Sequence, residues 1–459
     1  MSQTFDCLLV KPVHKGQCIA RVNGKVLLVQ GGIPGEKVSV EIVEEKKSYS
    51  VARVVKVILP SPSRVSGVWR EGEEKGLGGL ELSHVAYPDQ LKWKTDVLND
   101  SFSRIAGEKV LAQLKELPPI NVRDVNTRSG YAVHGLPPAK DHTHWRTRMV
   151  FVADKDSNLG MSKYHTNDIL AVETMPLASK KILDSGILGK NGILKSVLSP
   201  GDIVYCVVDS QDGVYFTVND VTYDVNGEII NNPVLIERVK TFASDVYEYK
   251  VNPTSFWQIH EKAPNILVDT VLKASSGQDF SSYSDFNPLV LRDSAFSLGE
   301  KIRQSLAGKK VLELYSGSGL FTKPLADYVG KNGKIVAIEG DRQATQSAKE
   351  NLKDSLNVEC FKANIDGKLI SKVISKYGQF DVVVADPSRS GCGKEVVQKI
   401  CAESGAEYFV YIACDIASLS RDIKVAVENG YKIAQIVSYD LFPHTHHFET
   451  VALLERVRK

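Results

Sequence analysis

The chain has 459 residues, of which 43% are apolar and 24% are charged, and its formal net charge is +2. These values are ordinary for globular proteins, so they exclude a chain that is disordered throughout, and the length predicts two or three domains. The small net charge does not by itself indicate a nucleic-acid partner, although charge can be distributed unevenly along a chain.

The start of the sequence, "MSQTFDCLLVKPVHKG", lacks the pattern of an export signal, and no run of eighteen apolar residues occurs. We therefore predict a cytoplasmic protein without membrane segments. The seven cysteines are odd in number, scattered and never spaced as C-x-x-C, which favours reduced thiols over disulfides or zinc ligands.

Short strand-like runs separated by glycine and proline turns fill residues 1–62. Five such runs predict a small β-barrel, an architecture that closes its own sheet edges. The first 65 residues contain ten Lys or Arg against five Asp or Glu. This basic bias favours RNA binding by the barrel, and a purely structural barrel is the alternative.

Residues 63–250 have a mixed pattern that predicts a central β-rich domain with little evident chemistry. Residues 90–106 have helical spacing, and strand-like segments such as "TRMVFVAD" and "GDIVYCVVDS" follow them. Residues 274–297 are rich in serine and lack periodicity, which predicts a linker or a surface insertion.

From residue 308 onward, apolar strand-like runs alternate with helical stretches up to the final "FETVALLER". This alternation predicts an α/β domain over 251–459 with a doubly wound, mostly parallel, seven-stranded sheet. Such sheets bind ligands beyond the carboxyl ends of their strands. The helices are expected at 320–329, 341–353, 367–377, 393–404 and 416–429.

The segment "VLELYSGSGLFTKPLA", 311–326, has the order strand, glycine turn, helix. Gly317 and Gly319 allow a tight turn and a close approach to a ligand, but the third glycine of a dinucleotide motif is absent. Glu339 ends the next strand, where a carboxylate can accept both hydroxyls of a ribose. Adenosine binding without a pyrophosphate site indicates S-adenosylmethionine, and an ordinary turn with a surface acid is the alternative.

Two further strands end in residues that carry chemistry. Asp386-Pro387 follows "VVVA", so Asp386 is expected at the ligand edge of the sheet, with Arg389 able to pair with a phosphate or a carboxylate. Cys414 follows "EYFVYIA", which predicts a thiol in the cleft. A neighbouring cation or helix end would lower its pKa and favour a nucleophile, whereas an inert buried thiol is the alternative.

The last motif, "FPHTHHFETVALLER", contains three histidines and places Glu449 at the head of the final strand. Zinc binding by His444, His446 and His447 is disfavoured because no cysteine or further histidine pair stands at ligand spacing. A solvated acid at a strand edge is one interpretation of Glu449. A general base beside Cys414 is the other.

In this order, "YSGSGLF", "ADPSRSG", "ACDIASLSRD" and "FPHTHHFE" resemble the motifs of the S-adenosylmethionine-dependent RNA 5-methyluridine methyltransferases, which act on rRNA or tRNA. The resemblance spans nearly the whole chain. "GGIPGEKVSVEI" and "PSPSRV" are similar to that family's TRAM domain, an OB-like barrel that holds RNA. The family implies a Rossmann-like class I methyltransferase domain, an RNA partner and no DNA substrate.

The resemblance also implies roles for particular residues. Cys414 takes the place of the nucleophile that adds to C6 of uracil, and Glu449 takes the place of the base that removes the C5 proton. The positions that contact S-adenosylmethionine are Gln258, Tyr315, Leu320, Glu339, Asn364 and Asp386. Leu320 can offer only apolar or backbone contact, where the family has a polar side chain.

The sequence departs from the family pattern at several positions. Many members carry four cysteines that hold an iron–sulfur cluster, whereas Leu77, Leu80 and Met175 stand at such positions here, so we expect no cluster. Near the reacting groups, Ser388 replaces a proline, and Asp415-Ile416 replaces Asn-Pro. In addition, His260 stands where asparagine is usual. An inward-pointing Asp415 would raise the pKa of the thiol.

The leading hypothesis is therefore methylation of a uridine C5 in structured RNA. A non-catalytic RNA-binding protein that retains the fold is the alternative from another class, and the departures at Ser388, Asp415 and Ile416 support it. Cytosine C5 methylation is disfavoured, because that chemistry places a cysteine where Arg389 stands.

Overall fold

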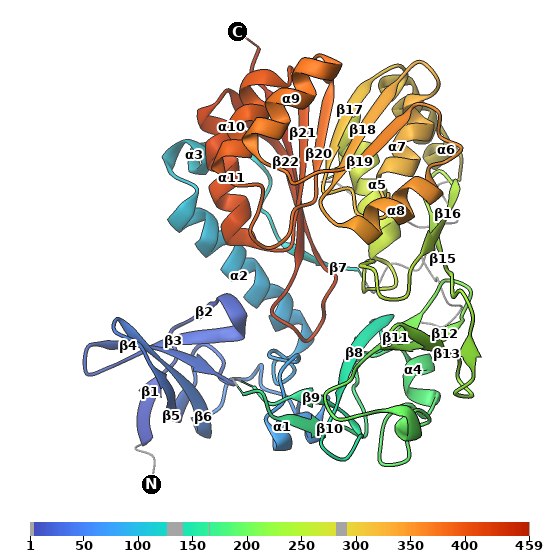
Figure 1. The fold of residues 1–459 in the computed structure, drawn as a ribbon. Coiled ribbons are helices and arrows are strands. Elements are labelled where there is room, and N and C mark those ends of the chain that lie inside the picture. The colour runs from blue at the N-terminus through green and yellow to red at the C-terminus, as the bar shows by residue number, and fades with distance from the viewer. Residues whose placement is uncertain (1–3, 126–140, 165, 281–291, 459) are drawn as a thin grey trace.

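The computed structural model describes residues 4–125, 141–164, 166–280 and 292–458. Figure 1 shows three parts: an N-terminal β-barrel, a central β-rich part beside it, and a C-terminal α/β part above both. Within the described residues, no helix combines the length and the apolar character needed to cross a membrane. All seven cysteines are free thiols, as the sequence predicted.

The barrel is a six-stranded sheet with the order β1-β5-β6-β4-β3-β2. Its core contains Cys18, Val29 and Val40, which alternate with outward-facing residues along their strands. The run "CLLVKPV" forms two strands where the sequence predicted one, because the chain changes partners at Leu9 and Val10, from Glu36 to Ile19. The strands are β1 (Thr4–Leu8), β2 (Lys11–Val13), β3 (Gln17–Val22), β4 (Lys25–Gln30), β5 (Lys37–Glu45) and β6 (Tyr49–Leu59).

The central part is β-rich, in agreement with the sequence. Its antiparallel sheet has the order β10-β9-β8-β11-β12-β13-β14, and a separate hairpin joins β15 to β16. Short helices α1 (Arg70–Lys75) and α4 (Lys180–Asp184) flank it. The strands are β8 (Arg148–Ala153), β9 (Leu159–Ser162), β10 (Ile169–Ala171), β11 (Ile203–Val208), β12 (Val214–Val218), β13 (Val221–Tyr223), β14 (Ile229–Ile230), β15 (Leu235–Lys240) and β16 (Val246–Val251).

The C-terminal part is the predicted doubly wound α/β fold, with the strand order β19-β18-β17-β20-β21-β23-β22-β7. Strands β19 to β21 are parallel, and β23 is antiparallel to both of its neighbours. The strands from the C-terminal part are β17 (Lys310–Leu314), β18 (Lys334–Glu339), β19 (Val358–Lys362), β20 (Val382–Ala385), β21 (Tyr408–Ala413), β22 (Tyr431–Asp440) and β23 (Glu449–Arg456).

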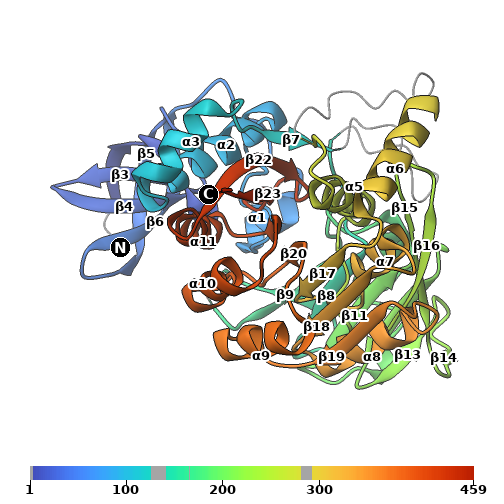
Figure 2. The same ribbon diagram turned by 90° about the horizontal axis from the view of Figure 1, so that it is seen from above.

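Helices cover both faces of this sheet, as Figure 2 shows from above. The core on one face includes side chains of α9, α10 and α11, and the core on the other face includes side chains of α5 and α7. The five helices predicted from 320 to 429 are all present, with boundaries that shift by at most two residues. They are α7 (Thr322–Val329), α8 (Arg342–Asn351), α9 (Gly367–Tyr377), α10 (Lys394–Glu403) and α11 (Ile416–Glu428).

The sheet has eight strands, so the seven-stranded prediction was incomplete. The extra strand, β7 (Val122–Asp124), pairs in parallel with the end of β22. Helices α2 (Tyr87–Ile105) and α3 (Glu108–Glu116) precede β7 and pack on α11. This segment belongs to residues that the sequence grouped with the central part. Three residues are too few to show strand periodicity, which explains the omission.

The serine-rich segment 274–297 is only partly accounted for by the prediction of a linker. Helix α5 (Ala263–Ser275) extends into its start, and α6 (Arg292–Leu306) begins before its end. The intervening residues 281–291 lie outside the described part of the chain.

Candidate active site

Strands β21 and β23 bring together the residues predicted as nucleophile and base. The two strands are antiparallel, with Ala413 opposite Thr450. Cys414 and Glu449 are the next residues outward, so they stand opposite each other, where Cβ atoms lie about 5 Å apart in antiparallel pairs. Cys414 is half-buried and Glu449 is 5% exposed.

The electrostatics of this pair favour protonated groups while the site is free. Burial, followed by the carboxyls of Glu449 and Asp386, raises the pKa of the Cys414 thiol to about 12, and Arg389 acts in the opposite direction. The net shift is opposite to the lowered pKa that the sequence associated with a nearby cation. Burial and Asp386 raise the pKa of Glu449 well above its usual range.

Asp386 is the third member of the cluster and follows the last residue of β20. It is half-buried in a site lined by other acids. Burial, reinforced by the neighbouring carboxylate of Glu339, raises the pKa of Asp386 to about 7. The structure therefore joins Cys414, Glu449, Asp386 and Glu339 at one sheet edge, as the sequence predicted from the ends of their strands.

The glycine turn after β17 has a backbone suited to a close ligand. Tyr315, Gly317 and Gly319 have φ values of 61°, 55° and 92°, in the left-handed region that glycine tolerates best. A Cβ atom at Gly317 would meet nothing within 4 Å. The carboxylate of Glu339 accepts hydrogen bonds from Gly317 N at 2.8 Å and from Asp341 N at 2.7 Å, so it fixes this turn to the end of β18.

Polar groups at this turn fit a polar cofactor. The hydroxyls of Ser316 and Ser318 are buried without a hydrogen-bond partner among the described residues. A buried polar group without a partner is costly, so a ligand that supplies hydrogen bonds would stabilise it. These residues, together with the open space at Gly317, are compatible with S-adenosylmethionine.

One acid in this region escaped the sequence analysis. Glu313 lies within the otherwise apolar strand β17, is 1% exposed, and has no hydrogen bond to either carboxyl oxygen within standard distance. Burial, together with the charges of Asp386 and Glu339, raises its pKa to about 8 despite an opposing contribution from Thr322. A single glutamate inside the run "KKVLELY" was the available signal, because charged residues are seldom fully buried.

The remaining predicted cofactor positions lie around the same edge. Leu320 is 7% exposed, and its carbonyl accepts a hydrogen bond from Tyr249 at 2.8 Å. Tyr249 in turn packs on Trp257, which places the half-buried Gln258 next to this contact in the chain. Asn364 is exposed and follows Ala363, whose N–H donates to Glu339 O at 2.9 Å.

Two departures from the family pattern have structural explanations. Asp415 caps α11, since its Oδ1 accepts the Ser418 N–H at 2.8 Å, and its Oδ2 lies 3.7 Å from the His14 ring of the barrel. His260 is fully buried and stacks on Trp145. Burial lowers the pKa of His260 to about 3, so its ring is neutral.

A buried carboxylate anchors the loop that follows Asp386. Asp422 in α11 accepts hydrogen bonds from Tyr411 Oη at 2.7 Å and from the backbone N–H groups of Cys392 at 2.9 Å and Gly393 at 3.2 Å. Arg421 also donates to it, at 2.8 Å. These contacts fix the C-terminal end of the loop that carries Arg389 above the thiol.

The three histidines of the last motif do not form a metal site. His446 contacts Glu81 at 3.2 Å, and His447 contacts Arg389 at 3.3 Å. His444 Nε2 lies 2.7 Å from the carbonyl of Asp141. No group of three or more His, Cys, Asp or Glu side chains is arranged to hold a metal ion within the described ranges.

Apolar side chains occupy the positions where related chains carry cluster cysteines. Leu77 and Leu80 pack against the core of the central part, which includes the buried Met175. The methyl group of Met175 lies 3.8 Å from the Cβ position of Gly79. Aliphatic side chains supply no ligand for iron, so the residues at these positions do not fit a cluster.

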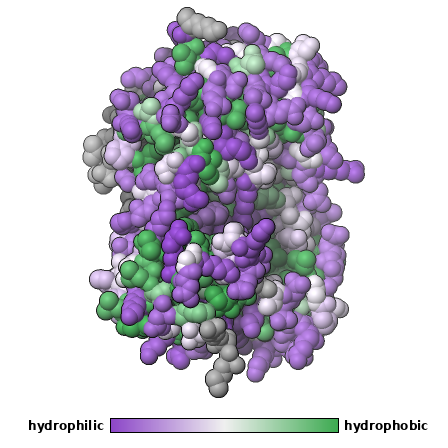
Figure 3. Space-filling view, turned by 90° about the vertical axis from the view of Figure 1, so that its left-hand side faces the viewer, coloured by the Kyte–Doolittle hydropathy of each residue, from purple (hydrophilic) through white to green (hydrophobic). Residues whose placement is uncertain are grey.

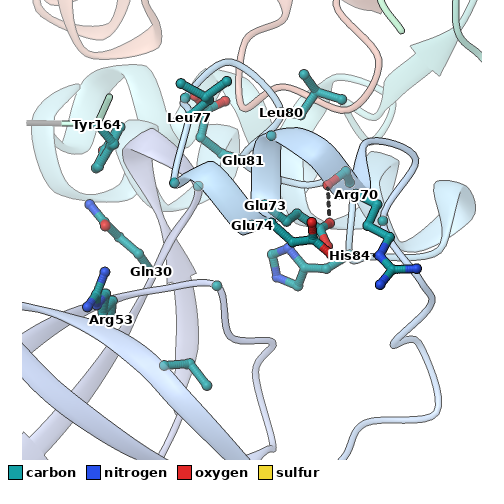
Figure 4. A pocket seen from close by; sticks show the side chains of 18 of the residues that line it. Gln30, Arg53, Arg70, Glu73, Glu74, Leu77, Leu80, Glu81, His84 and Tyr164 are labelled. Atoms are coloured by element: carbon teal, nitrogen blue, oxygen red, sulfur yellow. Dashed lines mark hydrogen bonds and ion pairs between the residues drawn. The ribbon is translucent and has the colours of Figure 1, made fainter. Parts of the chain in front are cut away.

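A cavity of about 900 Å³ lies between the barrel and the central part, apart from the thiol. Figure 4 shows Gln30 and Arg53 of the barrel facing the segment that carries Glu73 and Leu77, with Tyr164 at one side. The exposed residues Lys15, Lys56 and Lys163 also line it. Figure 3 shows apolar patches in the lower half of the molecule, and the barrel there exposes Leu8, Val10 and Leu59.

Comparisons with known proteins agree with this architecture. The family model for tRNA (uracil-5-)-methyltransferases matches residues 300–457, and the TRAM domain matches residues 3–55. The crystal structure of Pyrococcus abyssi tRNA (uracil-54, C5)-methyltransferase in complex with S-adenosyl-L-homocysteine superposes with a TM-score of 0.61. It is 20% identical, with 98% of this chain and 99% of that chain covered, so it shows a shared fold.

Relatives resemble the chain over nearly its whole length. An uncharacterized RNA methyltransferase of Bifidobacterium longum is 31% identical over 454 residues, which are 96% of this chain and 94% of the relative. The 23S rRNA (uracil(1939)-C(5))-methyltransferase RlmD of Acinetobacter baumannii is 27% identical, with 95% and 90% covered. The chain therefore belongs to the S-adenosylmethionine-dependent RNA 5-methyluridine methyltransferase family.

Proposed function

We propose that this enzyme methylates C5 of a uridine in structured RNA through a covalent bond between Cys414 and C6 of the base. The observation that carries the proposal is the position of Cys414 directly across from Glu449 at the ligand edge of the sheet, with Asp386 beside them. A thiol and two carboxyls that meet in this way provide a nucleophile and a base for one small substrate.

The reaction needs both groups because C5 of uracil is a poor nucleophile. The Cys414 thiolate adds to C6, and the electron pair of the C5–C6 double bond moves toward C5 and O4. C5 then attacks the methyl carbon of the sulfonium, and the methyl–sulfur bond breaks. Glu449 accepts the C5 proton, the electron pair of that C–H bond restores the double bond, and the thiolate leaves.

S-adenosylmethionine supplies the methyl group and a positive charge when it is bound. Tyr315, Glu339, Asp386, Gln258, Leu320 and Asn364 are the residues proposed to hold it. A positive charge near Cys414 and Glu449 lowers the pKa of both groups, which favours the ionised forms that the chemistry requires. The carboxyl cluster of the free site is therefore suited to a cationic ligand.

The RNA partner is proposed to bind through the barrel, whose domain type and basic bias support it. A uridine in folded RNA is stacked, so the target must lie in a loop or be flipped out to reach Cys414. One relative is named for 23S rRNA and one structural neighbour for tRNA, so both RNAs are candidate substrates. The cytoplasmic location and the absence of a DNA substrate stay predictions.

Methyl transfer from labelled S-adenosylmethionine to total rRNA and total tRNA tests this proposal. Nucleoside analysis is expected to find 5-methyluridine in one of the two pools. The absence of this nucleoside from both pools would contradict the activity, and 5-methylcytidine in its place would indicate the wrong base.

The covalent step has a separate test. RNA with 5-fluorouridine at the target should form an adduct that survives SDS, because fluorine at C5 cannot be removed as a proton. Cys414→Ala should abolish the adduct, and Cys392→Ala is the matched control, since that thiol is buried on the neighbouring loop. An adduct that persists in Cys414→Ala would show that another residue is the nucleophile.

A further inference from the structure

The loop that leads into Glu449 is fixed by a helix from a distant part of the chain. Residues 441–448 connect β22 to β23, and Glu449 is the first residue of β23, paired with Tyr439. In Figure 1 this loop descends from the C-terminal sheet beside α2. Because Glu449 starts its strand, its position depends on the path of this loop.

Lys94 of α2 binds the beginning of the loop. Its Nζ lies 2.7 Å from Asp440 Oδ1 and 3.0 Å from the carbonyl oxygen of Phe442. Asp440 Oδ1 also accepts the N–H of Phe442, at 3.2 Å. Both charged side chains are fully buried, with 0% exposure, so the pair is retained against a considerable desolvation cost.

Gln90, one turn earlier on α2, binds the middle of the loop. Its Oε1 accepts the N–H of His444 at 2.9 Å, and its Nε2 lies 3.2 Å from His444 Nδ1. His444 has a φ of 66°, a conformation that costs energy for a residue with a side chain. Leu82 N donates to the carbonyl of His444 at 2.9 Å and reinforces this bend.

We propose that Gln90 and Lys94 are positioning residues for Glu449, acting through the 441–448 loop during removal of the C5 proton. The two residues are four positions apart, so they lie on one face of α2 and bind two successive points of the loop. The inference rests on the proposed role of Glu449. It adds that residues before the methyltransferase part set the geometry of the base.

Two variants separate this role from a general effect on folding. Gln90→Leu removes both contacts with His444. Lys94→Met is combined with Asp440→Asn, so that no buried carboxylate is left without its cation. Lys92→Met is the matched control, because Lys92 is on the same helix but exposed and paired with Asp96. Thermal unfolding of each purified variant identifies those that remain folded at the assay temperature.

The assay compares two RNAs in single turnover with S-adenosylmethionine. With uridine RNA, we expect methylated product to form about tenfold to a hundredfold more slowly in the Gln90 and Lys94 variants, since a misplaced catalytic group costs up to about that factor. A methylated protein–RNA adduct should accumulate. With 5-fluorouridine RNA, adduct formation should stay within about twofold of wild type, because that step needs Cys414 and not the base.

The outcomes distinguish this role from the proposed function. Folded variants with wild-type turnover would overturn the positioning role, and so would variants in which both RNAs react equally slowly. Wild-type enzyme that forms no adduct with 5-fluorouridine RNA would overturn the covalent mechanism and the positioning role with it. Wild-type trapping with normal variants would overturn the positioning role alone.

Discussion

Binding of S-adenosylmethionine should weaken below neutral pH because of Asp386. Burial and Glu339 raise the pKa of this carboxyl to about 7, far above the usual value near 4. The ionised form attracts a sulfonium and the protonated form does not, so bound cofactor lowers this pKa. Affinity is therefore highest above pH 7 and is lost as the pH falls below it.

The size of the effect follows from the ionised fraction. With a pKa of about 7, Asp386 is ionised in about 9% of molecules at pH 6 and in about 50% at pH 7. The dissociation constant should then be about fivefold larger at pH 6 than at pH 7. Glu313 contributes little over this range, because burial raises its pKa to about 8 and it stays mostly protonated.

Isothermal titration calorimetry at the two pH values measures this difference. S-adenosylhomocysteine is the control ligand, because it has the same amino-acid group but no sulfonium charge, and its dissociation constant should change less. Asp386→Asn should flatten the pH dependence, whereas Asp354→Asn, an exposed acid after α8, should retain it. Equal affinity of the wild type at both pH values, or an unchanged dependence in Asp386→Asn, would refute the reasoning.

Three further predictions concern the loop after Asp386, the barrel and the RNA path. Asp422→Asn should raise the KM for S-adenosylmethionine about tenfold, because it weakens charge-assisted hydrogen bonds to that loop; a steady-state KM equal to that of wild type would contradict this. Glu36→Gln should destabilise the barrel by about 2–3 kcal/mol, since this buried carboxylate accepts four hydrogen bonds. Faster hydrogen exchange in β5 and β6 measures that loss, and because hydrogen bonds hold the pKa of Glu36 low against burial, the contribution is present above about pH 4.5 and lost at lower pH. Lys56→Met with Lys163→Met should reduce the salt dependence of RNA binding by about 0.7 to 0.9 per phosphate contact, whereas Lys399→Met on α10 should not. A slope that stays at the wild-type value would place the RNA elsewhere.

Sequence patterns identified the elements that alternate regularly and the residues at their ends. Glu339, Asp386 and Cys414 were found because each one ends an apolar run, and parallel strands bring such ends to one edge. The same approach found five helices to within two residues of their ends. Local periodicity is sufficient for these features, because it depends only on neighbours within one element.

Features that depend on distant residues were missed or misread. The pair formed by Lys94 and Asp440 joins residues 346 positions apart, so no local pattern indicates it. Asp415 was considered only as a charge near the thiol, although an aspartate before a helical run is a typical N-cap. The structure assigns it that role, through the hydrogen bond to Ser418 N.

The antiparallel direction of β23 explains how a base can stand at the beginning of a strand. In a fully parallel sheet, the amino ends of the strands lie at the edge opposite the ligand. Strand β23 runs against β21, so its first residue, Glu449, reaches the edge where Cys414 ends the preceding strand. The β22–β23 hairpin that makes this reversal carries its loop at the same edge, where α2 binds it. The reversed strand and its attachment to α2 are therefore one arrangement, and each is needed to place a carboxyl opposite the thiol.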